Sequence, residues 1–512
     1  MLFEQVAQTS ATLAQTAARK KKVAVLAELL RQVPAGERAI AARHFSGEVG
    51  HKLGVGYALV GELRGAVPPA AAAALTLAEV NQRFAAIAAL AGGGSAKARR
   101  DGFGALLAAA TELEQGFLAA LVLGELRQGA LDALVVDALA LATALPARRV
   151  RDAYMLAGDV GVVAEAVLAD GAAGLAGFAL TLFRPILPML AQSAEDTGEA
   201  LASFGGPMSL ELKLDGFRVQ LHKDGDEVRV YSRALNDVTA SIPEVVAAVR
   251  ALPAERLVLD GEAIAYGANG RPLPFQDTMK RKGDGAGALA LSIFDALRID
   301  DHTMLATPAR ERWEAIAQLA PAHAVPRIIT DDPAAAIAFY EDAIGRGHEG
   351  VMAKALDAPY DAGSRGAAWL KIKKVRRLDL IVLAAEWGSG RRRGWLSNIH
   401  LGARDPAGGA PVMLGKTFKG MTDAVLAWQT AQFLAREQDR DGHIVYVRPE
   451  LVAEIAFNDV QRSSHYPGGL TLRHARVIRY RDDKTAAEAD TIDAVRAIAV
   501  ADGVVPSSSG IV

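Results

Sequence analysis

The sequence predicts a multidomain protein in which an all-helical N-terminal region precedes an α+β region and a small β-rich region. The 512 residues suffice for about three domains, at roughly 100–200 residues per domain. Apolar residues recur at helical spacing before about residue 190, whereas the alternation typical of strands begins at Leu210. Hydrophobic residues make up 51% of the chain, which is enough for several cores.

The helical pattern defines the N-terminal region. Its clearest stretches are Val23–Leu30, Ala105–Leu123 and Ala130–Leu145. The apolar window 171–191 contains Arg184 and two prolines, so we expect a buried helix and a loop there rather than a membrane span. These patterns predict a helical domain over residues 1–195.

Strand-like alternation defines the middle region. The polar segment 192–206 ends in Gly-Gly-Pro and is expected to be a linker. The strings L-E-L-K-L, F-R-V-Q-L-H and V-R-V-Y-S follow, and helices are expected at Pro243–Ala251 and Pro308–Leu319. We therefore expect an α+β domain over residues 203–377.

The third region combines short strands with one helix. The strings D-L-I-V-L-A-A-E, S-N-I-H-L-G-A and P-V-M-L-G-K-T precede an expected helix at Ala424–Glu437, and two more strands follow. Short strands around one helix are typical of a small barrel. We expect a β-barrel OB-fold domain over residues 378–487 and a partly disordered C-terminal tail over residues 488–512.

Charge and cysteine content exclude several classes of protein. Lys and Arg number 57 and Asp and Glu 59, so a wholly basic nucleic-acid coat is excluded, although local basic grooves are not. The absence of cysteine excludes disulfides and cysteine-ligated zinc or iron–sulfur sites. The N-terminus lacks a signal-peptide pattern, and we expect a cytoplasmic, nucleoid-associated protein without membrane contact.

The string E-L-K-L-D-G-F-R at Glu211–Arg218 carries the strongest chemical signal. On an alternating strand, Glu211, Lys213 and Asp215 share one face. Lysine is a weak nucleophile at its ordinary pKa of about 10.4, so it attacks phosphorus only where its neighbours favour the neutral amine. A charged strand that ends in an Asp-Gly turn would explain the string alone equally well.

Further strings follow in a fixed order, and together they make a chance match to a known family much less probable. They are Ser232-Arg233, Leu259–Glu262, Ser292–Asp295, Glu349–Lys354, Trp369–Lys374 and Arg473–Lys484. Together they make the chain resemble the covalent nucleotidyltransferases, and within them the ATP-dependent DNA ligases that carry an N-terminal helical DNA-binding domain. The resemblance covers nearly all of the first 484 residues, and it implies an ATP-grasp-like nucleotidyltransferase domain in the middle.

The resemblance implies a nucleotide site around Lys213, which would become covalently linked to AMP from ATP. Glu211 would accept a hydrogen bond from the exocyclic amine of adenine. Phe294 and Met352 would sandwich the base, although both would be equally ordinary as core residues.

The same resemblance assigns charged residues to the phosphates and to a divalent cation. Those expected at the ribose and the phosphates are Asp215, Arg218, Arg233, Lys371 and Lys373. Carboxylates together with phosphate oxygens suit Mg²⁺, with Mn²⁺ as the alternative. Glu262 and Glu349 are the expected metal ligands.

The last string lies in the third domain. Its basic residues would reach the β- and γ-phosphates only if that domain swings over the middle one. These residues are Arg473, Arg476, Arg479 and Lys484. The family more often has R-F-P-R where this chain has R-H-A-R, which keeps the basic positions but changes the local packing.

The resemblance also implies nicked double-stranded DNA as the partner of a monomeric protein. The strings K-L-G-V-G and E-L-R-Q-G resemble loops that meet the minor groove, where glycine permits close approach and arginine supplies charge. Helix-capping glycines and a surface arginine would explain both strings equally well. The expected DNA contacts are Lys52, Gly54, Arg127, Gly129 and Arg365.

Several other functions compete with a DNA ligase. An RNA ligase or capping-type nucleotidyltransferase shares the lysine chemistry, but the long helical N-terminal region argues against it. A P-loop ATPase is disfavoured because Gly409–Thr417 has five residues between its glycines instead of four, and we expect a hairpin there. A non-catalytic scaffold is disfavoured by the intact charged residues, and an NAD-dependent ligase by the missing cysteines.

Overall fold

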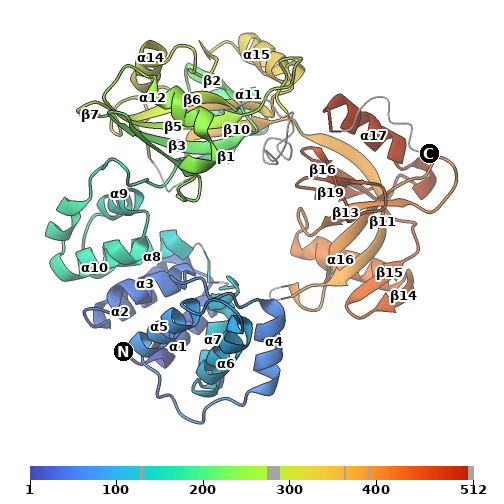
Figure 1. The fold of residues 1–512 in the computed structure, drawn as a ribbon. Helices are drawn as coiled ribbons and strands as arrows, with labels where there is room; N and C mark the ends of the chain where they lie inside the picture. The colour runs from blue at the N-terminus through green and yellow to red at the C-terminus, as the bar shows by residue number, and fades with distance from the viewer. Residues whose placement is uncertain (127, 130, 274–288, 362–364, 390–391, 505–512) are drawn as a thin grey trace.

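Three successive regions form an open arc in the computed structural model of the chain (Figure 1), which describes residues 1–126, 128–129, 131–273, 289–361, 365–389 and 392–504. Each region buries its own hydrophobic cluster or clusters. The expected order of a helical, an α+β and a β-rich region is therefore confirmed. No helix of the described part is long and apolar enough to cross a membrane.

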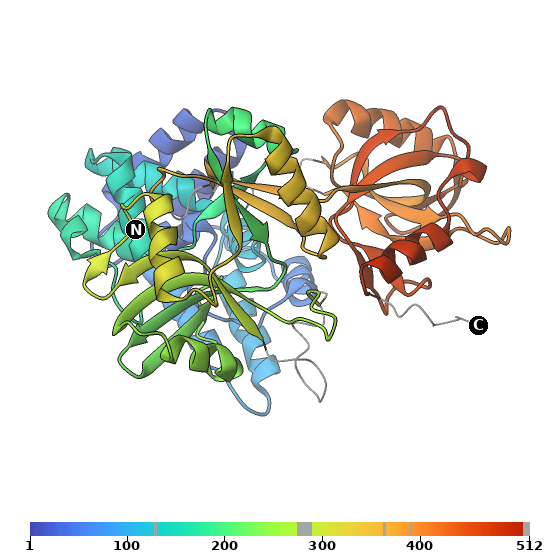
Figure 2. The same cartoon turned by 90° about the horizontal axis from the view of Figure 1, so that it is seen from above.

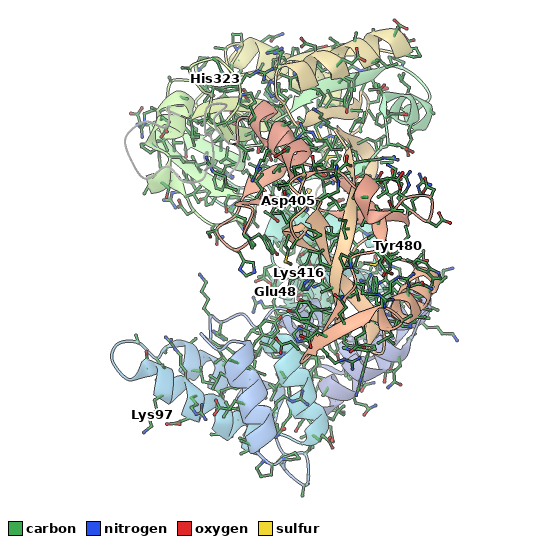
Figure 3. The ribbon with its side chains drawn as sticks, turned by 90° about the vertical axis from the view of Figure 1, so that its right-hand side faces the viewer. Glu48, Lys97, His323, Asp405, Lys416 and Tyr480 are labelled. Atoms are coloured by element: carbon green, nitrogen blue, oxygen red, sulfur yellow. The ribbon has the colours of Figure 1, made fainter. Side chains whose placement is uncertain are left out.

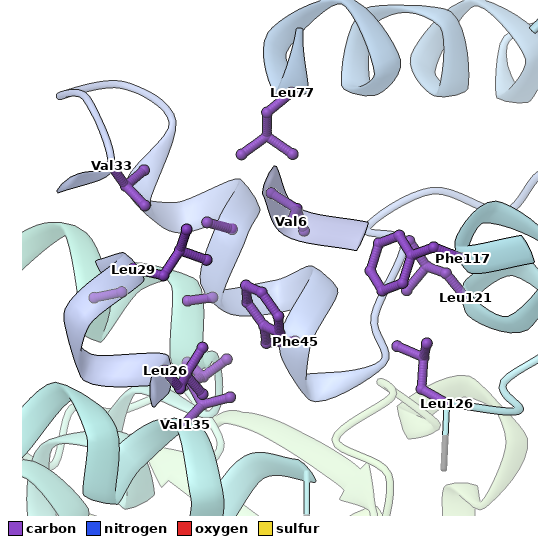
Figure 4. Close-up of a cluster of buried hydrophobic side chains, with 14 of the residues drawn as sticks. Val6, Leu26, Leu29, Val33, Phe45, Leu77, Phe117, Leu121, Leu126 and Val135 are labelled. Carbon is purple, nitrogen blue, oxygen red and sulfur yellow. The ribbon is translucent and has the colours of Figure 1, made fainter. Parts of the chain in front are cut away.

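The N-terminal region is a bundle of helices around one core. Phe45 and Phe117 lie in that core with Leu26 and Val135 (Figure 4). Its elements are α1 (Phe3–Gln15), α2 (Arg19–Gln32), α3 (Arg38–Ser46), α4 (Tyr57–Ala66), α5 (Leu77–Ala88), α6 (Ser95–Ala108), α7 (Glu112–Val122), α8 (Leu131–Thr143), α9 (Ala147–Ala157), α10 (Val160–Asp170) and the 3₁₀ helix η1 (Ala173–Gly177).

Two expectations for this region are corrected. The stretch Ala105–Leu123 is two helices, because the Thr111 side chain accepts from the backbone N–H of Glu114 and starts α7 with a capping box. Residues 171–191 form η1, an extended segment and the start of the first strand, and not a buried helix. Three glycines and two prolines in this window disfavour a regular helix.

The middle region contains two five-stranded sheets with helices beside them. The strand orders are β1-β10-β9-β2-β8 and β4-β3-β5-β6-β7. The elements are β1 (Leu190–Ser193), α11 (Thr197–Phe204), β2 (Met208–Lys213), β3 (Phe217–Asp224), β4 (Glu227–Ser232), η2 (Thr239–Ser241), α12 (Pro243–Arg250), β5 (Arg256–Ile264), β6 (Ala290–Ile299), β7 (His302–Thr303), α14 (Ala309–Leu319), β8 (Arg327–Thr330), α15 (Pro333–Gly345), β9 (Gly350–Ala355) and β10 (Arg365–Lys373).

The expected linker 192–206 is folded. It contains the end of β1, which pairs in parallel with β10, and the helix α11. Its polar residues serve as a helix start, since the Asp196 side chain accepts from the backbone N–H of Glu199. The middle region therefore begins before residue 192.

The third region is built around a seven-stranded sheet. Its pairing runs β13-β12-β11-β15-β14, with β16 joining β11 to β19, and does not close into a barrel over the described residues. The elements are β11 (Arg376–Trp387), β12 (Leu396–Ala403), β13 (Val412–Thr417), α16 (Asp423–Leu434), β14 (Glu437–Asp441), β15 (Ile444–Val447), β16 (Val452–Phe457), β17 (Val460–Arg462), β18 (Leu470–Leu472), β19 (Arg476–Tyr480), η4 (Ala486–Glu488) and α17 (Ile492–Ala501).

Two details of the third region bear on the sequence predictions. Strand β13 pairs antiparallel with β12, so the P-loop-like string forms the expected hairpin. Part of the expected tail is folded, because Ile492, Val495 and Ala499 of α17 belong to the core of this region. The rest of the tail, residues 505–512, lies outside the described residues.

The third region stands beside the other two, as the view from above shows (Figure 2). Strand β11 leaves β10 after only two residues, so the connection between the middle and third regions is short. From the side, Lys97 of α6 and His323 of the middle region lie at opposite ends of the molecule (Figure 3).

Candidate active site

Strand register brings the charged strings of the middle region together. Glu211 of β2 lies opposite Met352 of β9, which in turn lies opposite Lys371 of β10. One step along, Lys213 and Lys373 flank Gly350 in the same way. Directly opposite residues of neighbouring strands point to the same face, so residues far apart in the sequence share one surface.

Two glycines are required by close packing beside this surface. A Cβ atom on Gly216, in the Asp-Gly turn after β2, would lie 2.5 Å from the carbonyl oxygen of Ala263. A Cβ atom on Gly350 would lie still closer to the carbonyl oxygen of Ile372, and its φ of +149° also disfavours other residues. The glycines of both strings are therefore needed by the fold at this site.

A cavity of about 440 Å³ opens over this surface. It is lined by both sheets of the middle region and by the third region. The residues expected at the nucleotide that line it are Glu211, Lys213, Asp215, Arg218, Arg233, Glu262, Phe294, Glu349, Met352, Lys371, Lys373 and Arg473. Residues that the family resemblance assigned to the nucleotide thus line one continuous cavity.

Glu349 joins two of the lysines at the charged end of the cavity. Its two carboxylate oxygens form ion pairs with Lys213 Nζ and with Lys373 Nζ. Burial tends to raise the pKa of Glu349, but the two ammonium groups outweigh it and lower that pKa. Glu349 is therefore an anion that holds the expected nucleophile in place.

Glu262 lies on the other sheet and is less well compensated. Its Oε1 accepts from the backbone N–H of Gly216 at 3.1 Å. Burial raises the pKa of Glu262 to about 7, although the charges of Lys213 and Arg218 oppose the rise. A cation near this carboxylate would therefore be favourable.

The carboxylates fit a divalent cation that is completed by other ligands. Over the described residues, no three acidic or histidine side chains gather closely enough to hold a metal by themselves. Mg²⁺ commonly binds one or two carboxylates together with substrate phosphates and waters. Glu262 and Glu349 fit that pattern, because no cationic side chain of the described residues forms an ion pair with the half-buried Glu262.

Arg218 lines the cavity but is held by partners that the sequence analysis missed. Its Nε and Nη2 donate to the two oxygens of Asp260 at 3.0 and 2.6 Å, and Nη1 donates to the carbonyl of Met189 at 2.8 Å. Tyr360 Oη donates to Asp260 at 2.7 Å. Arg218 could therefore contact ribose or phosphate only through the N–H groups that these hydrogen bonds leave unused.

The other end of the cavity is apolar. Leu190 and Ala191 of β1 line it with Phe294, Met352 and Trp369. A buried ion pair closes this end, with Lys354 Nζ 2.6 Å from Glu211 Oε2. Neither β1 nor Lys354 was singled out for the site from the sequence, although Lys354 ends one of its strings.

The string at the end of the third region is divided by the structure. Arg473 reaches the cavity, with Nη1 3.0 Å from Asp215 Oδ2 of the middle region. Arg479 instead donates to Glu454 at 2.8 Å, Lys484 to Asp379 at 2.6 Å, and Arg476 is exposed on β19. In this arrangement those three residues do not line the cavity, so their expected phosphate contacts would require the third region to move.

The expected DNA contacts of the N-terminal region lie on two neighbouring loops. Lys52 and Gly54 are exposed just before α4, and Tyr57 Oη is 3.4 Å from Glu125 Oε1 on the second loop. Lys22 Nζ donates to the carbonyl of Gln128, next to the exposed Gly129. Arg127 and the side chain of Arg365 lie outside the described residues.

Comparison with known proteins agrees with this arrangement. Residues 188–373 match the family described as ATP dependent DNA ligase domain, residues 392–484 match ATP dependent DNA ligase C terminal region, and residues 55–140 match DNA ligase N terminus. The chain belongs to the ATP-dependent DNA ligase family, which confirms the resemblance and the enzyme class expected from the sequence.

Individual relatives cover nearly the whole chain. The "Probable DNA ligase" of Anaeromyxobacter dehalogenans (strain 2CP-C) is 56% identical over 97% of this chain and 99% of its own. The "Probable DNA ligase" of Beutenbergia cavernae is 54% identical over 98% of this chain and 100% of its own. The solved structure Pmar-Lig_PreS3 shares the fold over 93% of this chain and 99% of its own, with 19% identity and a TM-score of 0.63.

Proposed function

We propose that this protein seals nicks with 5′-phosphate and 3′-hydroxyl ends in duplex DNA, using ATP and an AMP group carried by Lys213. One observation carries the proposal. Lys213 lies in a cavity that combines apolar side chains such as Phe294 and Met352, as a base requires, with the basic residues Lys371, Lys373 and Arg473, as phosphates require. A family member with an intact set of these residues is expected to retain the activity.

The first step transfers AMP to the protein. Lys213 Nζ attacks the α-phosphorus of ATP, a nitrogen–phosphorus bond forms, and pyrophosphate leaves. The Lys213 ammonium, which forms an ion pair with Glu349, must first lose a proton before its nitrogen can attack. A bound Mg²⁺ ion, held by Glu262 and Glu349, would neutralise phosphate charge in this step.

The later steps consume the adenylated lysine. An oxygen of the DNA 5′-phosphate attacks the AMP phosphorus and releases Lys213, and the 3′-hydroxyl then attacks the DNA phosphorus and releases AMP. We assign the grip on DNA to the N-terminal loops around Lys52 and Gly129, since phosphate contacts carry most of such affinity. The third domain, which we take to be of the OB-fold type, would serve both stages by moving.

The proposal is tested by labelling the protein with ATP that carries radioactive α-phosphate, followed by a denaturing gel. Wild-type protein should retain the label and then pass it to nicked DNA. Lys213→Ala should retain none, whereas Lys416→Ala, which removes a lysine of the third region outside the cavity, should behave like wild type. Label on the Lys213→Ala protein would place the nucleophile elsewhere.

A further inference from the structure

Lys354 is a buried cation at the apolar end of the cavity. Its side chain is 4% exposed, and that of its ion-pair partner Glu211 is 3% exposed. Burying two charges is costly unless each finds partners, so the remaining contacts of both groups matter.

The donors of Lys354 can be accounted for one by one. An ammonium group has three N–H donors and no acceptor. One is committed to Glu211 Oε2 at 2.6 Å and a second to the carbonyl oxygen of Phe294 at 2.9 Å. The ring centroid of Trp369 lies 4.5 Å from Nζ and that of Phe294 5.2 Å, so aromatic faces surround the third.

Glu211 keeps acceptor capacity after these contacts. Its Oε1 receives only a long contact from Ser209 Oγ, at 3.4 Å, while Oε2 takes the ion pair. The nearby Arg327 and Asp295 do not change this, because Arg327 stacks on Trp313 and Asp295 pairs with Arg312. The wall of the cavity thus offers an acceptor in Glu211 Oε1, whereas two of the three Lys354 donors are committed and aromatic rings surround the third.

This pattern distinguishes the two kinds of purine. Adenine presents an amine donor at position 6, which can donate a hydrogen bond to an acceptor such as Glu211. Guanine and hypoxanthine present a carbonyl oxygen there, which a carboxylate repels and which would need the donor that Lys354 has already committed. We infer that Lys354 sets the preference for adenine over 6-oxopurines, by holding Glu211 as an acceptor and keeping its own donors away from the base.

Lys354 is therefore a positioning residue that acts through Glu211, and the inference rests on the proposed function. Without Lys354, the buried Glu211 would lose its ion-pair partner, although the charge of Arg327, opposite it on β8, would remain. Burial already raises the pKa of Glu211 although Lys354 opposes the rise, so removal of Lys354 should raise that pKa further and favour the protonated carboxyl. A protonated carboxyl donates a hydrogen bond and would suit a 6-oxo group better.

The test measures self-labelling of the full-length protein with ATP and with inosine triphosphate, which differ at position 6. Loss of a hydrogen bond to a charged group changes a preference roughly 10- to 100-fold. Lys354→Met should therefore lower the ATP-to-inosine-triphosphate ratio of kcat/KM by about that factor, mainly through a higher KM for ATP. The ratio does not depend on the fraction of protein that is folded.

Two further variants show whether a change in the ratio is specific to Lys354 and whether it depends on Glu211. Lys223→Met removes another buried lysine of the same region, which lies outside the cavity, and should leave the ratio unchanged. In a Glu211→Gln background, Lys354→Met should have little further effect on the ratio, because the residue through which it acts is already altered.

The results separate this inference from the proposed function. An unchanged ratio in Lys354→Met, or the same loss in the Glu211→Gln background, would overturn the role of Lys354 while leaving the ligase assignment intact. Wild-type protein that cannot be labelled by ATP would instead overturn the proposed function itself.

Discussion

The nucleotide cavity of the middle region and the basic string of the third region differ in how their charged residues are held. In the cavity, Arg218 and Lys354 are bound by buried carboxylates of the same region. In the basic string, Arg479 and Lys484 are themselves more exposed and pair with carboxylates of their own region, and among the described residues of the string only Arg473 crosses to the middle region. The cavity is thus assembled before substrate arrives, whereas the string depends on the position of a domain.

The largest expected effect tests the buried half of this comparison. Asp260→Ala should lower the free energy of unfolding of the middle region by about 3–5 kcal/mol, because Arg218 would remain buried without its partner. Glu454→Ala, which removes the partner of two exposed arginines, should cost less than about 1 kcal/mol. Denaturant unfolding measures both, and equal losses would remove the distinction between the two regions.

A second prediction concerns the dependence on domain position. The double change Arg476→Ala with Lys484→Ala should slow adenylation on the order of 10²–10³-fold, because both residues would stabilise leaving pyrophosphate once the domain has moved. Sealing of a nick that already carries 5′-adenylate involves no pyrophosphate and should be unaffected. Single-turnover assays on the two substrates compare the steps, with Arg496→Ala on α17 as a surface control. Equal loss on both substrates would show that these residues contact DNA or hold the domain together.

The smallest expected effect concerns the contact between the regions. Burial, with the charges of Asp215 and Glu349, raises the pKa of Asp459 to about 6, while Arg473 opposes and Asp502 adds to the rise. Asp459 binds its proton more tightly where the third region contacts the middle region than it would when exposed, so this contact should be favoured as the pH falls through about 6 and opposed above it. His348 lines the same cavity as Asp459, and His474 follows Arg473, but burial lowers the pKa values of both histidines, to about 4 for His348.

Small-angle X-ray scattering at pH 5 and pH 8 measures the expected change. Wild-type protein should be slightly more compact at pH 5. Asp459→Asn should be as compact at pH 8 as at pH 5, because the neutral amide needs no proton. A pH response that persists unchanged in Asp459→Asn would assign it to another group.

The sequence was sufficient to predict which residues form the site where those residues lie close together on one strand. Alternation along one strand predicted that Glu211 and Lys213 share a face, and the family resemblance assigned the string around Glu349 to the same site. Asp260, Lys354 and β1 could not be placed in this way, since their importance depends on register between strands far apart in the sequence. The folded part of the expected tail escaped prediction for a similar reason, because only the core of the third region explains the apolar face of α17.

Strand β1 has a consequence for how such proteins can be recombined. The chain that leaves the N-terminal helices becomes, within a few residues, a wall of the nucleotide cavity, and the carbonyl of Met189 anchors Arg218 on the way. The helical region is therefore not a cassette that can be exchanged at a convenient junction near residue 200. In a chimaera joined there, β1 would come from the protein that supplies the helices. The affinity for the nucleotide would then depend in part on a segment that contains none of the reacting residues.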